Sequence, residues 1–170
     1  LVPTEKVCQI SPMKKESLDF LKTLLNTPSP SGYEMGVQDL IRRRLADLCD
    51  EVRTDVHGNV IGILNPGASF RLMLAGHCDE VGYMIMHIDE KGFLYFSPVG
   101  GTDPAIVIGQ RLRIHTRHGP ILGVVGRKPI HLTDPDEKNK MPKFHEMWLD
   151  IGAKNKKDAE KRVAIGDYAT

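Results

Sequence analysis

The apolar positions in the first fifty residues recur at helical spacing. Leucines on one face predict a helix over residues 17–26, which should end before the prolines at 28 and 30 because proline disfavours helix in the residue before it. A second stripe from Val37 to Leu48 predicts another helix, and we interpret residues 31–34 as its cap and first turn. The chain therefore opens with two amphipathic helices.

Strand-like segments follow the two helices. Residues 51–55 and 60–64 flank a turn at His57-Gly58-Asn59 and predict a β-hairpin. The apolar run Leu72–Ala75 has the length and composition of a buried strand, and it ends at Gly76. Two helices, a hairpin and a buried strand together predict an α/β layer in this half of the chain.

The second half of the chain consists mainly of short strands joined by turns. Gly92 ends a turn in which a positive φ is expected, and Arg111–Thr116 alternates apolar and polar residues as a half-exposed strand does. This pattern predicts a small barrel or a sandwich. The expected strands cover residues 81–88, 93–96, 111–116, 121–125 and 148–152.

Three further segments complete the prediction for this half. Residues 133–143 are polar and contain proline, so we expect a mobile loop. Residues 155–162 predict a small helix with Asn155 as its cap. Residues 165–170 are expected to turn into a new strand.

The candidate chemistry lies where the run Leu72–Ala75 ends. Gly76 is followed at once by His77, Cys78, Asp79 and Glu80. Alternation along an extended chain would point His77 and Asp79 the same way. The carboxylate could then hydrogen-bond one ring nitrogen and leave the other for a metal ion.

Two interpretations of this His-x-Asp motif compete. In the first, His77 is a satisfied histidine at a strand end and Asp79 begins a turn, which is the commoner case for an arbitrary motif of this kind. In the second, His77 is a metal ligand and Asp79 orients it. The three residues alone leave both interpretations open.

Composition and charge limit the possible partners. The 170 residues are 41% hydrophobic and 26% charged, as in an ordinary globular protein. Lys and Arg number 23 against 22 Asp and Glu, so no net field selects nucleic acid or an anionic membrane, and we expect neither as a partner. Residues 1–12 lack the apolar core of a secretory signal and are interpreted as a leader or a disordered tail.

The cysteines indicate a reducing compartment. Cys8, Cys49 and Cys78 are odd in number and have no framework spacing, so we expect no disulfide scaffold and a cytoplasmic location. Cys78 lies between two polar residues that share one face. We therefore expect its thiol to point the opposite way, into the core, as a small buried apolar group.

Several short motifs follow one another in order along the chain. They are Ser31-Gly32-Tyr33-Glu34, Asp55-x-x-Gly58-Asn59, Ala75-Gly76-His77-x-Asp79-Glu80-Val81-Gly82, His87-Ile88-Asp89-x-x-Gly92-Phe93, Gly100-Gly101, Ile108-Gly109-Gln110-Arg111, Gly123-Val124-Val125-Gly126-x-Lys128-Pro129-Ile130-His131, Asp150-Ile151-Gly152-Ala153 and Ile165-Gly166-Asp167. In this order and spacing they resemble the N-terminal half of the M42 metallo-aminopeptidases, whose members are often labelled deblocking or glutamyl aminopeptidases or endoglucanases. The resemblance covers about Met13 to Asp167.

The resemblance implies a two-metal exopeptidase that removes N-terminal residues from peptides. It implies His77 as a metal ligand and Asp79 as the catalytic-site acid that orients it; Cys78 stands where the family usually has methionine. The metals would be two divalent ions, zinc or cobalt, which polarise the scissile carbonyl and activate a water. Glycosidases instead use two facing carboxylates, so the endoglucanase label has little support here.

The implied fold is α/β, the N-terminal part of a phosphorylase/hydrolase-like aminopeptidase catalytic domain followed by a β-rich inserted domain, a small barrel that serves as lid and dimerisation domain. We expect the catalytic part over residues 13–81, the inserted domain over 82–165 and a return toward the catalytic domain at 166–170. The inserted domain implies a homo-oligomer, a dimer or a larger assembly.

The family's other metal ligands and its general-base glutamate follow the inserted domain, beyond Thr170. We therefore expect this chain alone to be inactive. Glu80 is a possible site-lining residue, and His131 could face a neighbouring active site. The alternative is a truncated relative that acts as an oligomerisation or binding module without catalysis.

Overall fold

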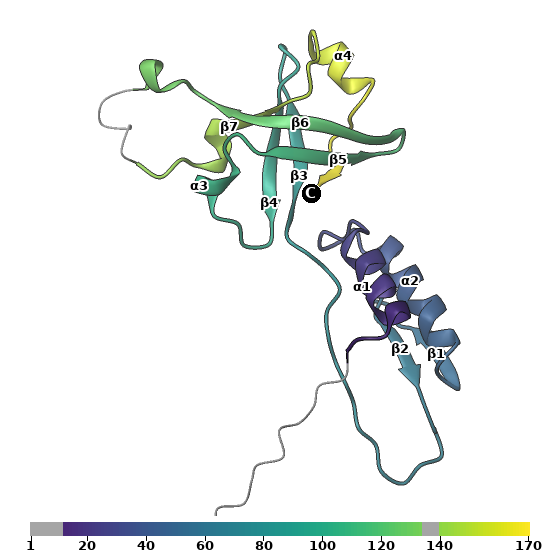
Figure 1. Ribbon diagram of the computed structural model, residues 1–170. Helices are drawn as coiled ribbons and strands as arrows, with labels where there is room; N and C mark the ends of the chain where they lie inside the picture. The colour runs from purple at the N-terminus through teal and green to yellow at the C-terminus, as the bar shows by residue number, and fades with distance from the viewer. Residues whose placement is uncertain (1–11, 134–139) are drawn as a thin grey trace, which may run out of the picture.

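A closed six-stranded barrel forms the second half of the chain in the computed structural model, which describes residues 12–133 and 140–170 (Figure 1). Its strand order is β3-β4-β7-β6-β5-β8, and the strand pairs are antiparallel. Of the two architectures expected from the sequence, the small barrel is confirmed and the sandwich is wrong. The strands are β3 (Gly82–Ile88), β4 (Leu94–Val99), β5 (Arg111–Thr116), β6 (Gly119–Arg127), β7 (Met147–Asp150) and β8 (Tyr168–Ala169).

The alternation of the strands supplies the barrel core. On β5, Leu112 and Ile114 are buried while Arg111 and Arg113 are exposed, as the sequence predicted. Equivalent positions on the other strands point inward and form one continuous cluster. Its most deeply buried members include Ile85, Leu94, Ile114, Met147 and Leu149.

The turn between β3 and β4 is built as the sequence predicted. The Asp89 carboxylate accepts hydrogen bonds from the amides of Lys91 and Phe93, and Gly92 has a φ of 90°. A side chain on Gly92 would also meet the carbonyl oxygen of Asn155 at 2.9 Å. This turn therefore needs glycine for both its backbone conformation and its packing.

We expect Gly92→Ala to lower the free energy of unfolding by about 1–3 kcal/mol, because a non-glycine residue at this φ is strained. Urea unfolding measures the change. Gly101→Ala is the matched control, since nothing lies within 4 Å of a Cβ added there. Equal midpoints for the two variants would contradict the requirement for glycine at residue 92.

The connections in the barrel half agree partly with the sequence. Asn155 caps α4 (Lys156–Glu160) by accepting from the Asp158 amide, as predicted. Three elements were missed, the short helix α3 (Pro104–Val107) and the 3-10 turns η1 (Ile130–Leu132) and η3 (Phe144–Glu146). Most of the loop expected over 133–143 lies outside the described residues.

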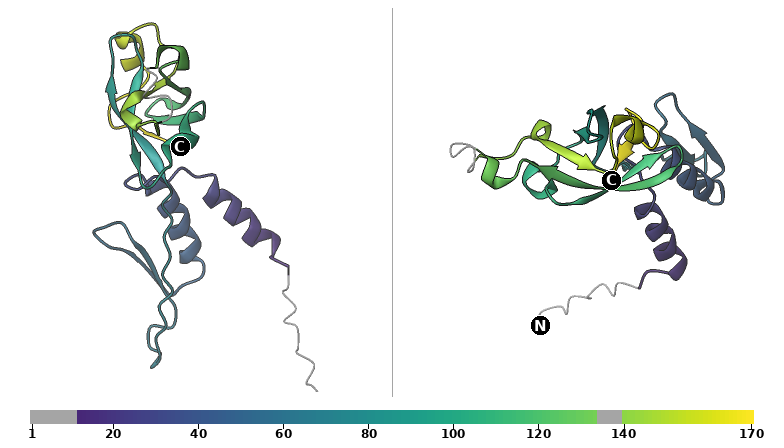
Figure 2. Two further views of the ribbon diagram at one scale, coloured as in Figure 1. Left: turned by 90° about the vertical axis from the view of Figure 1, so that its left-hand side faces the viewer. Right: turned by 90° about the horizontal axis from the view of Figure 1, so that it is seen from above.

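The first half contains both predicted helices, α1 (Lys15–Leu25) and α2 (Met35–Ala46), and the predicted hairpin of β1 (Glu51–Thr54) and β2 (Val60–Ile63). α2 packs along the hairpin, whereas α1 buries no residue (Figure 2). No helix of the described residues is long and apolar enough to cross a membrane. The expected leader or tail at 1–12 falls almost wholly outside the described residues.

Two expectations for this half are wrong. The segment 31–34 provides no side-chain cap for α2; Glu34 is the N-cap residue, and the Ser31 hydroxyl bonds elsewhere. The run Leu72–Ala75 is not a buried strand either, since Leu72, Met73 and Leu74 are 73%, 85% and 89% exposed.

The physical reason for the exposed run is the lack of a neighbouring strand. Residues 64–81 form an extended connection between the hairpin and the barrel (Figure 1), and none of the described strands runs beside Leu72–Ala75. A strand needs a ladder partner for its peptide groups, so a suitable apolar pattern alone does not form one.

Candidate metal centre

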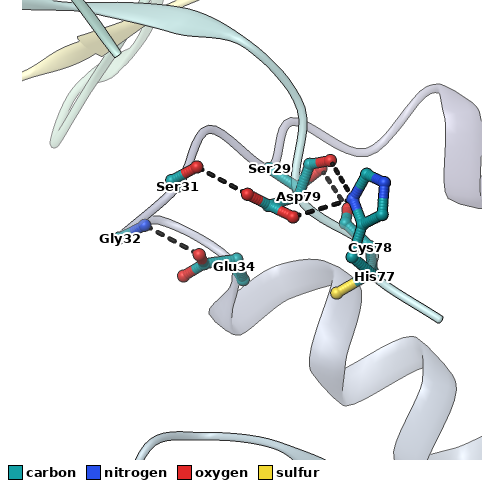
Figure 3. Close-up of polar contacts among 7 residues, drawn as sticks. All are labelled: Ser29, Ser31, Gly32, Glu34, His77, Cys78 and Asp79. Carbon is teal, nitrogen blue, oxygen red and sulfur yellow. Dashed lines mark hydrogen bonds and ion pairs between the residues drawn. The ribbon is translucent and has the colours of Figure 1, made fainter. Parts of the chain in front are cut away.

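His77 and Asp79 lie in contact in this connection. The Nδ1 atom of His77 is 2.9 Å from Oδ1 of Asp79 and 3.2 Å from the Asp79 carbonyl oxygen (Figure 3). The His77 side chain is 86% exposed, and no hydrogen bond among the described residues involves its Nε2. The two side chains therefore point the same way, as the His-x-Asp spacing predicted.

Two oxygens of Asp79 face Nδ1 of His77, the nearer one on the carboxylate and the other on the carbonyl, and they decide which ring nitrogen carries the proton. Ionised carboxylate accepts hydrogen bonds only, so Nδ1 must donate, and the lone pair of neutral imidazole then lies on Nε2. This is the form in which histidine binds a metal ion. One His-Asp pair consequently offers one oriented metal ligand.

A hydroxyl from the first half of the chain holds the other carboxylate oxygen. Ser31 Oγ donates to Asp79 Oδ2 at 2.6 Å, although 48 residues separate the two in sequence. This hydrogen bond, followed by that from His77, lowers the pKa of Asp79 below its usual range. The carboxylate thus stays ionised and able to accept from both partners.

The Ser29–Ser31 segment also binds the backbone around Asp79. Ser29 donates from its amide to Glu80 Oε1 at 2.9 Å and from its hydroxyl to the Cys78 carbonyl at 3.0 Å. The Glu80 amide returns a bond to the Ser29 carbonyl at 2.9 Å. Glu80 therefore lies beside the His-Asp pair, and its carboxylate is bound to the Ser29 amide.

The Cys78 thiol points away from the Asp79 carboxylate, toward α2 (Figure 3). It is half-buried, not enclosed in a core. Burial, followed by the charges of Glu34 and Asp79, raises the pKa of the thiol. Because the thiolate is the reactive and metal-binding form, this environment favours a structural role for Cys78.

A cavity of about 480 Å³ opens between α2, the hairpin turn and residues 76–79. His57 and Asp39 line it together with His77 and Asp79. The sequence pattern predicted a turn at His57, and nothing in the spacing indicated that this turn faces His77. Only the packing of the hairpin against α2 brings it there.

The described residues do not supply a complete metal site. Across 12–133 and 140–170, no group of three or more His, Cys, Asp or Glu side chains is arranged to hold an ion. His131 lies in η1 (Ile130–Leu132), exposed and beyond the end of β6, and it forms no such group with His77. The described residues therefore provide one ligand of a metal centre, His77.

The sequence profile that matches this chain is that of the M42 glutamyl aminopeptidases, over residues 58–170. The chain belongs to this family. It is 37% identical over 158 residues to the lysyl aminopeptidase of Pyrococcus furiosus. That match covers 89% of this chain and 45% of the Pyrococcus protein, so the chain spans about half the length of this M42 relative.

Solved structures agree with the M42 assignment. The TET aminopeptidase of a marine-sediment Thaumarchaeota archaeon has a TM-score of 0.86 and 34% identity, covering 91% of this chain and 44% of that one. The TET1 peptidase of Pyrococcus horikoshii has a TM-score of 0.78 and 31% identity, covering 90% and 46%. The latter assembles into a tetrahedron or a large octahedral shell.

Proposed function

We propose that this chain is the N-terminal portion of a binuclear-metal aminopeptidase, to which it contributes one metal ligand, His77, and the acid that orients it, Asp79. The hydrogen bond between His77 Nδ1 and Asp79 Oδ1 carries this proposal. It fixes the tautomer of His77 that leaves Nε2 available for a metal ion. The family to which the chain belongs consists of aminopeptidases, which supports the proposed reaction.

The side chains of His77 and Asp79 would have different roles at this metal centre. His77 would bind an ion through Nε2, and Asp79 would keep the ring oriented and increase its basicity. The two ions, zinc or cobalt, would polarise the scissile carbonyl and lower the pKa of a bound water. A zinc ion takes four ligands, so further ligands and the general base must come from residues other than those described.

We also propose that the 170-residue chain alone does not hydrolyse peptides. Glu80 and His131 remain proposals as site-lining residues, Glu80 beside the pair and His131 toward a neighbouring subunit. The substrate class proposed is peptides with a free amino terminus, and the proposed location is the cytoplasm.

The division into domains is also proposed. Residues 13–81 would belong to an α/β catalytic domain and residues 82–165 to an inserted lid and dimerisation domain. Strand β8 pairs with β3 and β5, which favours counting residues 166–170 with the barrel. The assemblies formed by the Pyrococcus horikoshii relative support a homo-oligomer here.

Asp79→Ala tests the role of the orienting acid. We expect metal affinity of the protein at its full natural length to fall by about 10–100-fold, as for loss of other partners of metal-binding histidines. Competition with a chromogenic chelator measures cobalt or zinc affinity. Asp89→Ala, which removes a turn carboxylate of the barrel, is the control and should leave affinity unchanged. Equal affinity for wild type and Asp79→Ala would contradict the proposed orientation of His77.

A second function, an oligomerisation or binding module without catalysis, is favoured by one observation. The barrel is closed and has its own continuous core, so it could act independently of the His-Asp pair. Aminoacyl chromogenic substrates with added cobalt or zinc separate the two functions. Cleavage by the full-length protein supports the aminopeptidase; no cleavage under any metal, with a stable oligomer, supports the module.

A further inference from the structure

The segment that carries the His-Asp pair has little regular structure of its own. His77 and Asp79 lie in the extended connection 64–81, and His77 is highly exposed. A ligand on such a segment loses conformational freedom when it binds a metal ion, unless another element already holds it.

The turn Ser29–Tyr33 is the element that holds it. Ser29 exchanges two hydrogen bonds with Glu80, and Pro30 forms a parallel bridge with the same residue. Ser29 itself is 4% exposed. One side of this turn is therefore bound to the segment immediately after Asp79.

The other side of the turn is packed against the barrel. The Tyr33 ring lies 5.2 Å from that of Tyr168 on β8 and 6.0 Å from that of His115 on β5. Tyr168 also approaches Gly32 so closely that an added Cβ would be 2.6 Å from its hydroxyl oxygen. The turn thus has contacts that fix it independently of Asp79.

Ser31 projects from this fixed turn toward Asp79 (Figure 3). Apart from His77, it is the one described side chain that hydrogen-bonds the Asp79 carboxylate. The two oxygens of the Asp79 carboxylate have different partners. Oδ2 accepts a hydrogen bond from Ser31, and Oδ1 faces Nδ1 of His77. Rotation of the carboxylate would break both contacts at once.

We infer that Ser31 is a positioning residue of the metal centre, which acts through Asp79 to fix the Nδ1–H form of His77 before metal binds. This inference rests on the proposed function for its metal, but its structural part can be tested without one. Ser31 would not touch the ion or the substrate. It would affect His77 only through the carboxylate of Asp79.

Nitrogen NMR of the histidine rings provides the metal-free test. At a pH of about 8.5, above the usual titration range of imidazole, long-range proton–nitrogen spectra of the labelled chain report the tautomer of His77. We expect the Nδ1–H form in the wild type and a mixture of both tautomers in Ser31→Ala. Ser31→Thr, which keeps the hydroxyl, should restore the wild-type spectrum.

A double-mutant cycle shows whether Ser31 acts through Asp79. In the Asp79→Ala background, Ser31→Ala should cause no further change in the His77 spectrum. Ser29→Ala is the matched control in the same turn, because its hydroxyl bonds a carbonyl and not the carboxylate. An unchanged His77 tautomer in folded Ser31→Ala, or an equal change in the Asp79→Ala background, overturns the inference.

Cobalt binding by the protein at its full natural length separates this inference from the proposed function. We expect Ser31→Ala to weaken cobalt binding by about 10-fold, the low end for partners of metal-binding histidines, and Ser31→Thr to recover most of it. Wild-type binding with no loss in Ser31→Ala overturns the inference and leaves the function intact. If the wild type binds no cobalt, the proposed function fails, and the NMR result alone decides the role of Ser31.

Discussion

His77→Ala should lower kcat/KM for aminoacyl substrates by more than about 100-fold in the protein at its full natural length, since it removes a ligand and not merely its partner. Asp79 occupies Nδ1 of the imidazole, so the lone pair of the ring lies on the exposed Nε2. Among the described residues, no group of three or more His, Cys, Asp or Glu side chains is arranged to hold an ion in its place. Excess metal should restore only a small part of the activity.

The assay needs a histidine control with no proposed role. His87 is exposed on β3 and lies beside Tyr95 in the barrel. His87→Ala should change kcat/KM by less than about twofold, as surface substitutions usually do. Metal content, measured by elemental analysis of the same samples, should fall in His77→Ala alone. Full activity in His77→Ala would rule out this residue as a ligand.

Leu149→Ala should lower the free energy of unfolding of the barrel by about 2–5 kcal/mol, the usual cost of a buried leucine-to-alanine change. Leu149 on β7 is 0% exposed and pairs with Leu94 on one side and Val125 on the other. Its side chain also fills the space above Gly123, where an added Cβ would lie 2.7 Å from its Cγ.

The cavity left by this change should therefore collapse only in part, because neighbouring backbone forms its wall. The expected loss in the free energy of unfolding is large compared with the total of about 5–15 kcal/mol that is typical of a whole domain. Urea unfolding followed by the fluorescence of Trp148, the single tryptophan, measures it. Leu122→Ala on the outer side of β6, 62% exposed, is the matched control and should change stability by less than about 0.5 kcal/mol. Similar losses in both variants would contradict a core position for Leu149.

The sequence predicted the features that depend on near neighbours along the chain. The alternation on β5, the Asn155 cap and the Gly92 turn were all recognisable, because each depends on side chains within a few residues. The contact between His77 and Asp79 is of the same kind, since a spacing of two along an extended chain brings both side chains to one side.

The strand order of the barrel was not predictable in this way. β7 pairs with both β4 and β6, and β8 closes the barrel between β3 and β5. These pairings join strands distant in sequence, and the pattern of a strand specifies its buried face but not its neighbour. A small barrel and a sandwich therefore remained equally compatible with the same runs.

The apolar run before the His-x-Asp motif also shows that a local pattern does not specify the neighbours of a segment. Leu72–Ala75 has the composition of a buried strand, but burial requires a partner, and none of the described residues provides one. Local composition can state what a segment is suited to form. Whether it forms depends on what packs against it.

The sequence by itself determined the His-x-Asp pair, three of the four described α-helices, most strands and several turns, because these follow from periodicity and short-range hydrogen bonds. Tertiary structure alone decided that Ser31 reaches Asp79 across 48 residues and that Tyr33 packs against the barrel through Tyr168. Such contacts depend on the path of the whole chain between them. No local pattern encodes that path.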